Sequence, residues 1–140
     1  MAPVRKLLLT TLMLLFLLPS FAFAFNNIMN VRHWAAPDHT RIVFDTSEES
    51  QYTIEKKEQS VVIEFSDATL APSVSQEIKL KKPDPCKVSI TILPENRIRV
   101  EISYPANVVT NIFKLKKVQD KPDRLVVDLE LPEIKKQAMQ

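Results

Sequence analysis

The sequence predicts an all-β fold, a sandwich of two packed four-stranded sheets, and three observations support this prediction. Short alternating or apolar segments rich in Val, Ile and Phe recur after residue 25, and Pro, Asn, Asp and Ser separate them. This pattern is typical of strands joined by turns. No segment after residue 25 has a sustained helical period, and the order of elements repeats in the two halves of the chain. We expect strands at residues 28–34, 40–46, 51–56, 60–66, 86–92, 97–103, 109–117 and 124–130.

The first 24 residues are typical of a Sec signal peptide. Arg5 and Lys6 give a positive start, a mainly apolar run extends from Leu7 to Leu18, and Ala22-Phe23-Ala24 provides a small-x-small cleavage site. The apolar run is shorter than the roughly 20 residues that span a bilayer. We therefore expect cleavage after Ala24, a single β domain over residues 25–140, no membrane span after processing, and a periplasmic location.

Charge and cysteine content narrow the functional classes. The chain has 19 Lys and Arg, and removal of Arg5 and Lys6 leaves 17 against 17 Asp and Glu. A chain with no net charge is a poor candidate for a nucleic-acid binder that neutralises phosphates. Cys86 is the only cysteine, so no intramolecular disulfide can form. A lone cysteine is more often a small buried apolar residue than a nucleophile, and we expect the former.

The turns of this chain are built without glycine, because the sequence contains none. Two-residue hairpin turns need a positive φ, which Asn and Asp adopt more readily than other residues. We therefore expect most connections to be longer or to use Pro and type I turns. Pro37-Asp38, Pro94-Glu95-Asn96 and Pro122-Asp123 fit this expectation, and the strongest break is Lys81-Lys82-Pro83-Asp84-Pro85.

The pattern on the two sides of that break is similar. The first half contains the segments Val31–Trp34, Arg41–Asp45, Gln51–Ile54 and Val61–Phe65. The second half contains the segments Val88–Ile90, Arg97–Glu101, Asn111–Phe113 and Leu125–Leu129. We predict two four-stranded units, related by a pseudo-twofold axis and packed face to face.

No arrangement of residues supports catalysis. A zinc hydrolase needs about three His or carboxylate ligands, and His33, His39 and Asp38 form the only candidate trio. Two histidines beside a turn are the simpler interpretation. Cys86 has no surrounding signature of a nucleophile, and no glycine is present to build a tight oxyanion or phosphate loop. We predict no enzyme activity, no metal site and no cofactor.

Strand periodicity divides two of the expected strands into an inward and an outward face. The residues expected in the core are Ile42, Phe44, Leu125, Val127 and Leu129. The outward residues are Arg41, Val43 and Asp45 on one strand and Arg124, Val126 and Asp128 on the other. Each outward face thus has the order Arg-Val-Asp. Such faces could bind a polar ligand through directed hydrogen bonds, or they could form cross-strand salt bridges.

Trp34 has two interpretations. It follows Arg32 by two residues, so both side chains point the same way along a strand. A Trp beside charged residues can stack against a sugar or a peptide, but a lone Trp in a small β domain is more often in the core. The core position is the expectation from the sequence.

Two segments resemble the signatures of the AMIN domain family. Residues 31–45 contain a Val-Arg-x-Trp segment, a Pro-Asp turn and an Arg-hydrophobic-hydrophobic-hydrophobic-Asp strand, as the opening of an AMIN domain does. Residues 121–129 resemble the second signature, a Pro-Asp-Arg followed by an alternating apolar strand that ends in Asp. The resemblance covers about residues 28–131.

The resemblance implies a non-catalytic targeting role in the cell envelope. AMIN domains precede N-acetylmuramoyl-L-alanine amidases and occur in type IV pilus secretins, so the implied ligand is peptidoglycan and the implied partner is a separately encoded amidase or secretin. The alternative is a protein-interaction subunit or regulator of an envelope machine, which exposed apolar patches at Val43 and Val126 would favour. The candidate peptidoglycan-binding residues are Arg32, Trp34, Asp38, Arg41, Asp45, Arg124 and Asp128.

Overall fold

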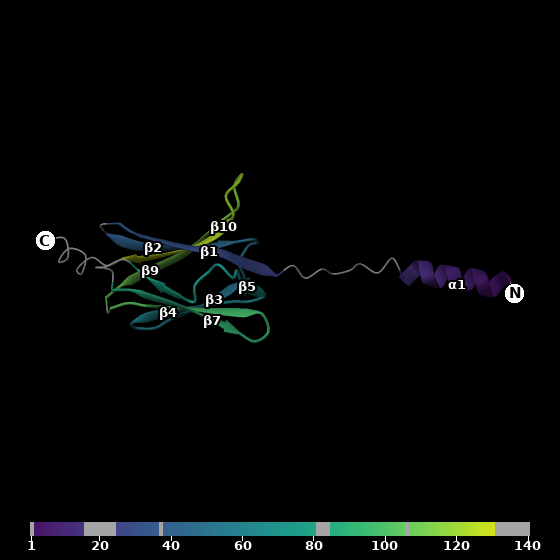
Figure 1. Cartoon of the computed structure of the whole chain (residues 1–140), viewed down its shortest axis with the longest axis horizontal. Coiled ribbons are helices and arrows are strands. Elements are labelled where there is room, and N and C mark those ends of the chain that lie inside the picture. The colour runs from purple at the N-terminus through teal and green to yellow at the C-terminus, as the bar shows by residue number, and fades with distance from the viewer. Residues whose placement is uncertain (1, 16–24, 37, 81–84, 106, 131–140) are drawn as a thin grey trace.

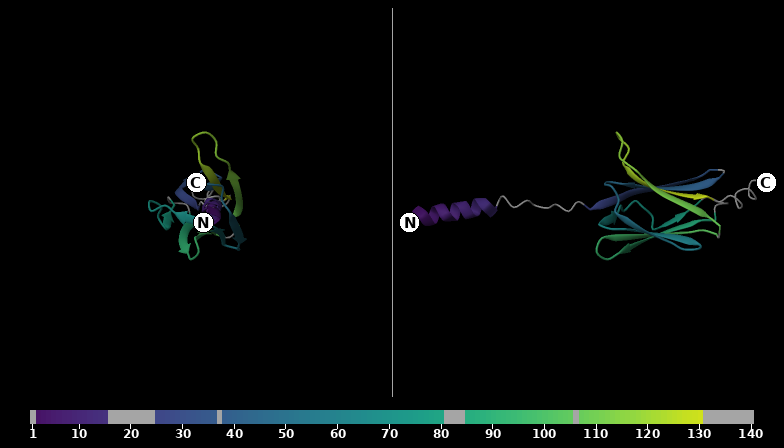
Figure 2. Two further views of the ribbon diagram at one scale, coloured as in Figure 1. Left: turned by 90° about the vertical axis from the view of Figure 1, so that its right-hand side faces the viewer. Right: turned by 180° about the vertical axis from the view of Figure 1, so that it is seen from behind.

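The computed structural model describes residues 2–15, 25–36, 38–80, 85–105 and 107–130. The elements are α1 (Ala2–Leu15), β1 (Asn26–Ala35), β2 (His39–Thr46), β3 (Tyr52–Lys56), β4 (Ser60–Phe65), β5 (Ala68–Leu70), β6 (Glu77–Lys79), β7 (Lys87–Leu93), β8 (Arg97–Ser103), β9 (Val109–Leu115) and β10 (Asp123–Glu130). The strands form two layers that pack face to face (Figures 1 and 2), which confirms the predicted all-β sandwich. Sheet A has the order β5-β1-β2-β10-β9 and sheet B the order β3-β4-β8-β7-β6.

All eight expected strands are present, as β1 to β4 and β7 to β10, but the expected four strands per sheet are wrong. Each sheet has five strands, because β5 pairs in parallel with β1 and β6 pairs antiparallel with β7. Both added strands are only three residues long. A segment of this length is too short for an alternating pattern to identify it from sequence.

The two halves of the chain are related as the repeat predicts, but neither half forms a sheet of its own. The first half places β1 and β2 in sheet A and β3 and β4 in sheet B, whereas the second places β7 and β8 in sheet B and β9 and β10 in sheet A. Each strand has a counterpart in the other half: β1 corresponds to β7, β2 to β8, β3 to β9 and β4 to β10. When every strand of the order β1-β2-β10-β9 in sheet A is replaced by its counterpart, the result is β7-β8-β4-β3, the order of the four long strands in sheet B. The prediction of two separate units packed face to face is therefore corrected to two units that each contribute to both sheets.

The core lies between the sheets and contains the residues expected from the alternation. Ile42, Phe44, Leu125, Val127 and Leu129 are all fully buried. The ring centroid of Phe44 in sheet A lies 5.8 Å from that of Phe65 in sheet B, a contact that joins the layers. Cys86 is also buried and belongs to the core cluster, which confirms its expected role as a small apolar residue.

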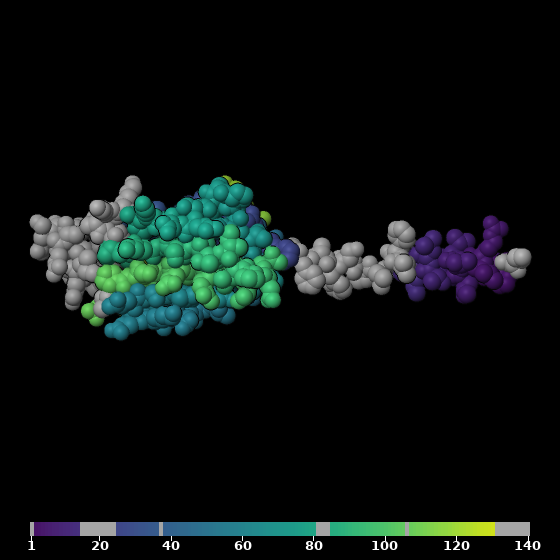
Figure 3. All heavy atoms as spheres, turned by 60° about the horizontal axis from the view of Figure 1, so that its bottom comes forward, coloured from purple at the N-terminus to yellow at the C-terminus, as the bar shows by residue number. Residues whose placement is uncertain are grey.

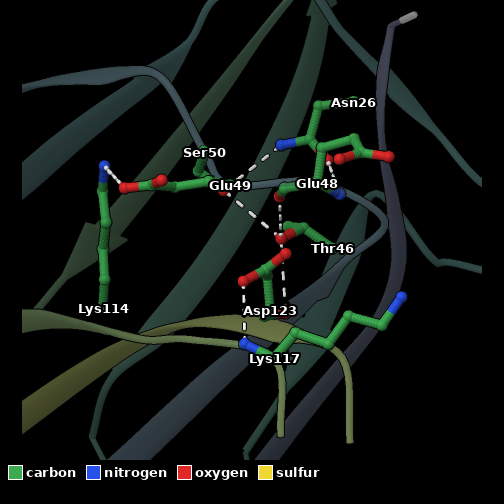
Figure 4. Close-up of polar contacts among 8 residues, drawn as sticks. All are labelled: Asn26, Thr46, Glu48, Glu49, Ser50, Lys114, Lys117 and Asp123. Carbon is green, nitrogen blue, oxygen red and sulfur yellow. Dashed lines mark hydrogen bonds and ion pairs between the residues drawn. The ribbon is translucent and has the colours of Figure 1, made fainter.

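A buried polar cluster holds the loop that follows β2 (Figure 4). Asn26 Nδ2 donates to Ser50 Oγ over 3.3 Å, and Asn26 Oδ1 accepts from the Glu48 backbone amide over 3.0 Å. Thr46 Oγ1 donates to the Glu48 carbonyl oxygen over 2.8 Å and lies 3.3 Å from the Asp123 carbonyl oxygen. Because these bonds join the starts of β1 and β10 to the end of β2, they fix the position of the last residues of β2.

The connections use positive φ values without glycine. The described residues with positive φ are Asp67, Glu95, Asn96, Asn107 and Gln119, with φ between 47° and 70°. Asn and Asp were expected at such positions, but Glu and Gln were not. These two longer side chains adopt the left-handed region at a steric cost that glycine would avoid.

The N-terminal segment forms a helix, and its large apolar side chains from Val4 to Leu14 are 59–70% exposed. The expected cleavage site at residues 22–24, Pro37, and the break at residues 81–84 lie outside the described residues. Within the part of the chain that is described, no helix combines the length and the apolar character needed to cross a membrane.

Candidate functional site: the Arg–Asp face of sheet A

The two Arg-Val-Asp segments lie side by side on the outer face of sheet A. Strands β2 and β10 are antiparallel neighbours, and their register pairs Arg41 with Asp128, Val43 with Val126, and Asp45 with Arg124. The sequence predicted two outward faces that are counterparts of each other, whereas the structure joins them into one. We call this surface the Arg–Asp face, and it comprises Arg32, Trp34, Arg41, Val43, Asp45, Phe113, Arg124, Val126 and Asp128.

Arg41 and Asp128 form a bidentate pair across the two central strands. Arg41 Nε donates to Asp128 Oδ1 and Arg41 Nη2 donates to Asp128 Oδ2, both over 2.7 Å. These hydrogen bonds, opposed in part by desolvation, raise the pKa of the Arg41 guanidinium above its ordinary value. The fork geometry fixes the orientation of both side chains.

A second bidentate pair joins β1 to β2. Arg32 Nε and Nη2 donate to the two carboxylate oxygens of Asp45, each over 2.8 Å. The same hydrogen bonds are the main reason why the pKa of Arg32 is raised. The Asp45 side chain is 10% exposed and that of Arg32 is 45% exposed, so the pair extends from a nearly buried carboxylate to a solvated guanidinium.

Arg124 is the third arginine of the Arg–Asp face and is bound differently. It lies opposite Asp45 in the β2–β10 register, but both oxygens of that carboxylate accept hydrogen bonds from Arg32. Its Nε is buried and has no hydrogen-bond partner among the described residues. The face therefore contains two arginines that are paired with carboxylates and a third, Arg124, that has no carboxylate partner in the part of the chain that is described.

Trp34 is not in the core, contrary to the expectation from sequence. Its side chain is on the outer face of sheet A and is 44% exposed. The guanidinium carbon of Arg41 lies 5.9 Å from the centroid of the Trp34 ring and 5.8 Å from that of Phe113 on β9. The two aromatic rings thus flank the Arg41 guanidinium. The physical reason is alternation: Trp34 shares its side of β1 with Arg32, whose charge must reach solvent.

The two valines at the centre of the Arg–Asp face are covered. Val43 is 3% exposed and Val126 is 1% exposed, although both lie on the outer side of sheet A. The register places Arg32 opposite Val43 and Phe113 opposite Val126, and long or aromatic side chains at such positions cover neighbouring apolar surface. The face therefore has no exposed apolar patch at Val43 and Val126.

Six of the seven predicted site residues meet on the Arg–Asp face, and Asp38 is the exception. Asp38 lies in the connection between β1 and β2, and its Oδ1 is 2.8 Å from Nδ1 of His39. The residue that sequence reasoning missed is Phe113. Its place opposite Val126 depends on the β9–β10 pairing. In the sequence, only the alternation of strand 109–117 could have indicated that Phe113 points outward.

The outer face of sheet B provides a contrast (Figure 3). There Glu64 accepts hydrogen bonds from Arg97 over 2.8 Å and from Arg99 over 3.4 Å, and these bonds lower the pKa of its carboxyl group. The outward positions of β3, β4, β7 and β8 include no aromatic residue. Sheet B thus has a related Arg–carboxylate cluster without a stacking surface.

No cluster of three or more His, Cys, Asp or Glu side chains that could hold a metal ion occurs among the described residues. The trio considered from the sequence, His33, His39 and Asp38, forms no such group. The chemistry that the Arg–Asp face offers is hydrogen bonding and stacking.

Comparison with known proteins agrees with this architecture. Among curated proteins, none has a sequence that matches the chain significantly. The family model described as the AMIN domain matches residues 30–129, well over half of the chain and both strands that carry the Arg-Val-Asp segments. The chain therefore belongs to the AMIN domain family.

Proposed function

We propose that this chain is an exported, non-catalytic module of the periplasm that binds peptidoglycan and localises a wall-associated system. AMIN domains are targeting modules of amidases and secretins, which supports an amidase or secretin as the system that is localised. The observation that carries the proposal is the Arg–Asp face. Its two bidentate pairs hold guanidinium and carboxylate groups in fixed positions, so a polar ligand would meet groups that are already oriented.

The alternative, a protein-interaction subunit of an envelope machine, would be favoured by exposed apolar surface at Val43 and Val126. Both residues are buried. A protein interface usually has an apolar centre with a polar rim, and the centre of the Arg–Asp face has no such exposed surface. The peptidoglycan proposal is therefore preferred.

Co-sedimentation with isolated sacculi tests this proposal. The wild-type protein should pellet with sacculi without hydrolysing them, and the double variant Arg41→Ala/Arg124→Ala should bind at least about tenfold more weakly. Each lost hydrogen bond to a charged guanidinium is worth about 1.5–3 kcal/mol, and about 1.4 kcal/mol corresponds to a factor of ten.

The matched control is Arg97→Ala/Arg99→Ala on sheet B, which also removes two arginines, both of them bound to Glu64. The control should pellet like the wild type, and circular dichroism should show that both variants are folded. Equal binding by the two double variants would place the ligand elsewhere. Failure of the wild type to pellet would refute peptidoglycan binding and favour a protein partner.

Export predicts a defined mature N-terminus. Signal peptidase should cleave after Ala24, because small residues occupy positions 22 and 24 while Phe23 can be large. Mass analysis of the protein from the periplasm should find Phe25 as its first residue. A start upstream of residue 20 would contradict the prediction.

A further inference from the structure

Four residues on the Arg–Asp face and at its margin form a row across four strands. The register places Trp34 of β1 opposite Arg41 of β2, Arg41 opposite Asp128 of β10, and Asp128 opposite Asn111 of β9. Adjacent strands are about 4.8 Å apart, so three steps span roughly 14 Å. The row therefore has an aromatic side chain at one end, followed by a guanidinium, a carboxylate and an amide, over the length of a short oligosaccharide.

The aromatic end of this row is exposed and fixed. Trp34 is 44% exposed, yet its ring packs beside the Arg41 guanidinium, which Asp128 holds from the other side. An indole in such a position offers a flat apolar surface next to hydrogen-bonding groups. A pyranose ring has matching chemistry, with an apolar C–H face and hydroxyl groups around its edge.

The charges of the row favour a neutral ligand. Arg41 and Asp128 neutralise each other, and Asn111 has no charge. Arg124, which has no carboxylate partner among the described residues, lies four residue pairs away along the β2–β10 ladder and is half-buried, with its Nε fully covered. The acidic peptide stems of peptidoglycan would need an accessible cation, whereas the hydroxyl and acetamido groups of its glycan strands need mixed donors and acceptors without net charge.

We infer that the Arg–Asp face recognises the glycan strand of peptidoglycan and not its peptide stems, with one sugar ring stacked on Trp34 and neighbouring sugars along the row to Asn111. This inference rests on the proposed function. It assigns stacking to Trp34 and hydrogen bonding to Arg41, Asp128 and Asn111.

Intrinsic fluorescence provides a direct test, because Trp34 is the only tryptophan in the chain. Peptide-free glycan strands, prepared from sacculi, should shift or quench the Trp34 emission in a saturable way when added to the purified protein, and so should tri-N-acetylchitotriose, a neutral oligosaccharide that lacks the free lactyl carboxylates of those strands. Isolated stem peptides at the same concentration should leave the emission unchanged.

Substitutions extend the test to whole sacculi. Trp34→Ala should weaken co-sedimentation at least about tenfold, as expected for a tryptophan that supplies a large part of the contact area, and Trp34→Phe should retain part of the binding. Ile92→Ala, which truncates a 56% exposed side chain on sheet B, is the matched control and should bind like the wild type. Thermal unfolding of each variant checks that the fold is intact.

The outcomes separate this inference from the proposed function. If wild-type protein pellets with sacculi but stem peptides, not glycan strands, change the Trp34 emission, the glycan assignment is wrong and peptidoglycan binding stands. The glycan assignment is also wrong if folded Trp34→Ala pellets as well as the wild type. If the wild type neither pellets nor responds to glycan strands, both proposals fail.

Discussion

Replacement of Phe44 by aspartate is expected to unfold the protein. Phe44 is fully buried, and its ring contacts Phe65 of the opposite sheet. Loss of a buried phenylalanine costs about 3–5 kcal/mol by itself, and an unpaired buried charge adds several kcal/mol. Because domains of this size are stable by only about 5–15 kcal/mol, far-ultraviolet circular dichroism should show loss of the β signal.

Two valines in adjacent strands provide a second destabilising variant and its matched control. Val127→Asp introduces the same charge at a fully buried position of β10 and should also unfold the protein, whereas Val109→Asp changes a 59% exposed side chain of β9. Surface substitutions usually change stability by no more than about 0.5 kcal/mol, so Val109→Asp should unfold like the wild type. Wild-type spectra for Phe44→Asp and Val127→Asp would show that the inward and outward faces of these strands have been exchanged.

Removal of the Asp45 carboxylate should have the next largest effect. In Asp45→Ala, the Arg32 guanidinium loses the carboxylate that accepts two of its hydrogen bonds, and Arg124 loses the carboxylate opposite it in the β2–β10 register. A buried ion pair that loses one partner costs about 3–5 kcal/mol. Since the Arg32 side chain is 45% exposed and solvent screens it, we expect about 2–3 kcal/mol, measured as a lower midpoint of urea unfolding.

Glu64→Ala on sheet B is the control for this prediction. It removes the carboxylate of a comparable cluster, but the Glu64 side chain is 24% exposed whereas that of Asp45 is 10% exposed, so the loss should be clearly smaller. Addition of Arg32→Ala to Asp45→Ala should recover part of the stability, because one of the two uncompensated charges is then absent. Equal losses for Asp45→Ala and Glu64→Ala would contradict the special position of Asp45.

The unpredicted parts of the fold have a common cause. Period-two alternation is a property of each strand alone, and it identified the eight long strands and the inward positions of Ile42 and Leu125. The three-residue strands β5 and β6 are too short to carry this pattern. The edge position of β5 depends on pairing with β1, which is distant in the sequence, and that of β6 depends on pairing with β7, the next strand of the chain.

The same difference applies to the candidate site. The sequence predicted that Arg32 and Trp34 share one side of a strand, and it listed six of the residues that form the Arg–Asp face. The core was expected for Trp34 because a lone tryptophan in a small β domain is usually buried. Which side of β1 faces solvent depends on which side packs against the other sheet, and the sequence of β1 alone does not contain that information. Phe113 was missed because its contact with Arg41 joins β9 to β2 across the intervening strand β10.

The sequence by itself determined the all-β class, the strand phases and the family resemblance, because hydrophobic alternation and short motifs are local in the chain. The tertiary structure decided which strands are neighbours, and thereby placed the two Arg-Val-Asp segments side by side on one face. It also decided that Asp45 binds Arg32 and not the Arg124 opposite it. These choices depend on pairing between distant segments and on the reach of competing side chains, neither of which a local pattern contains.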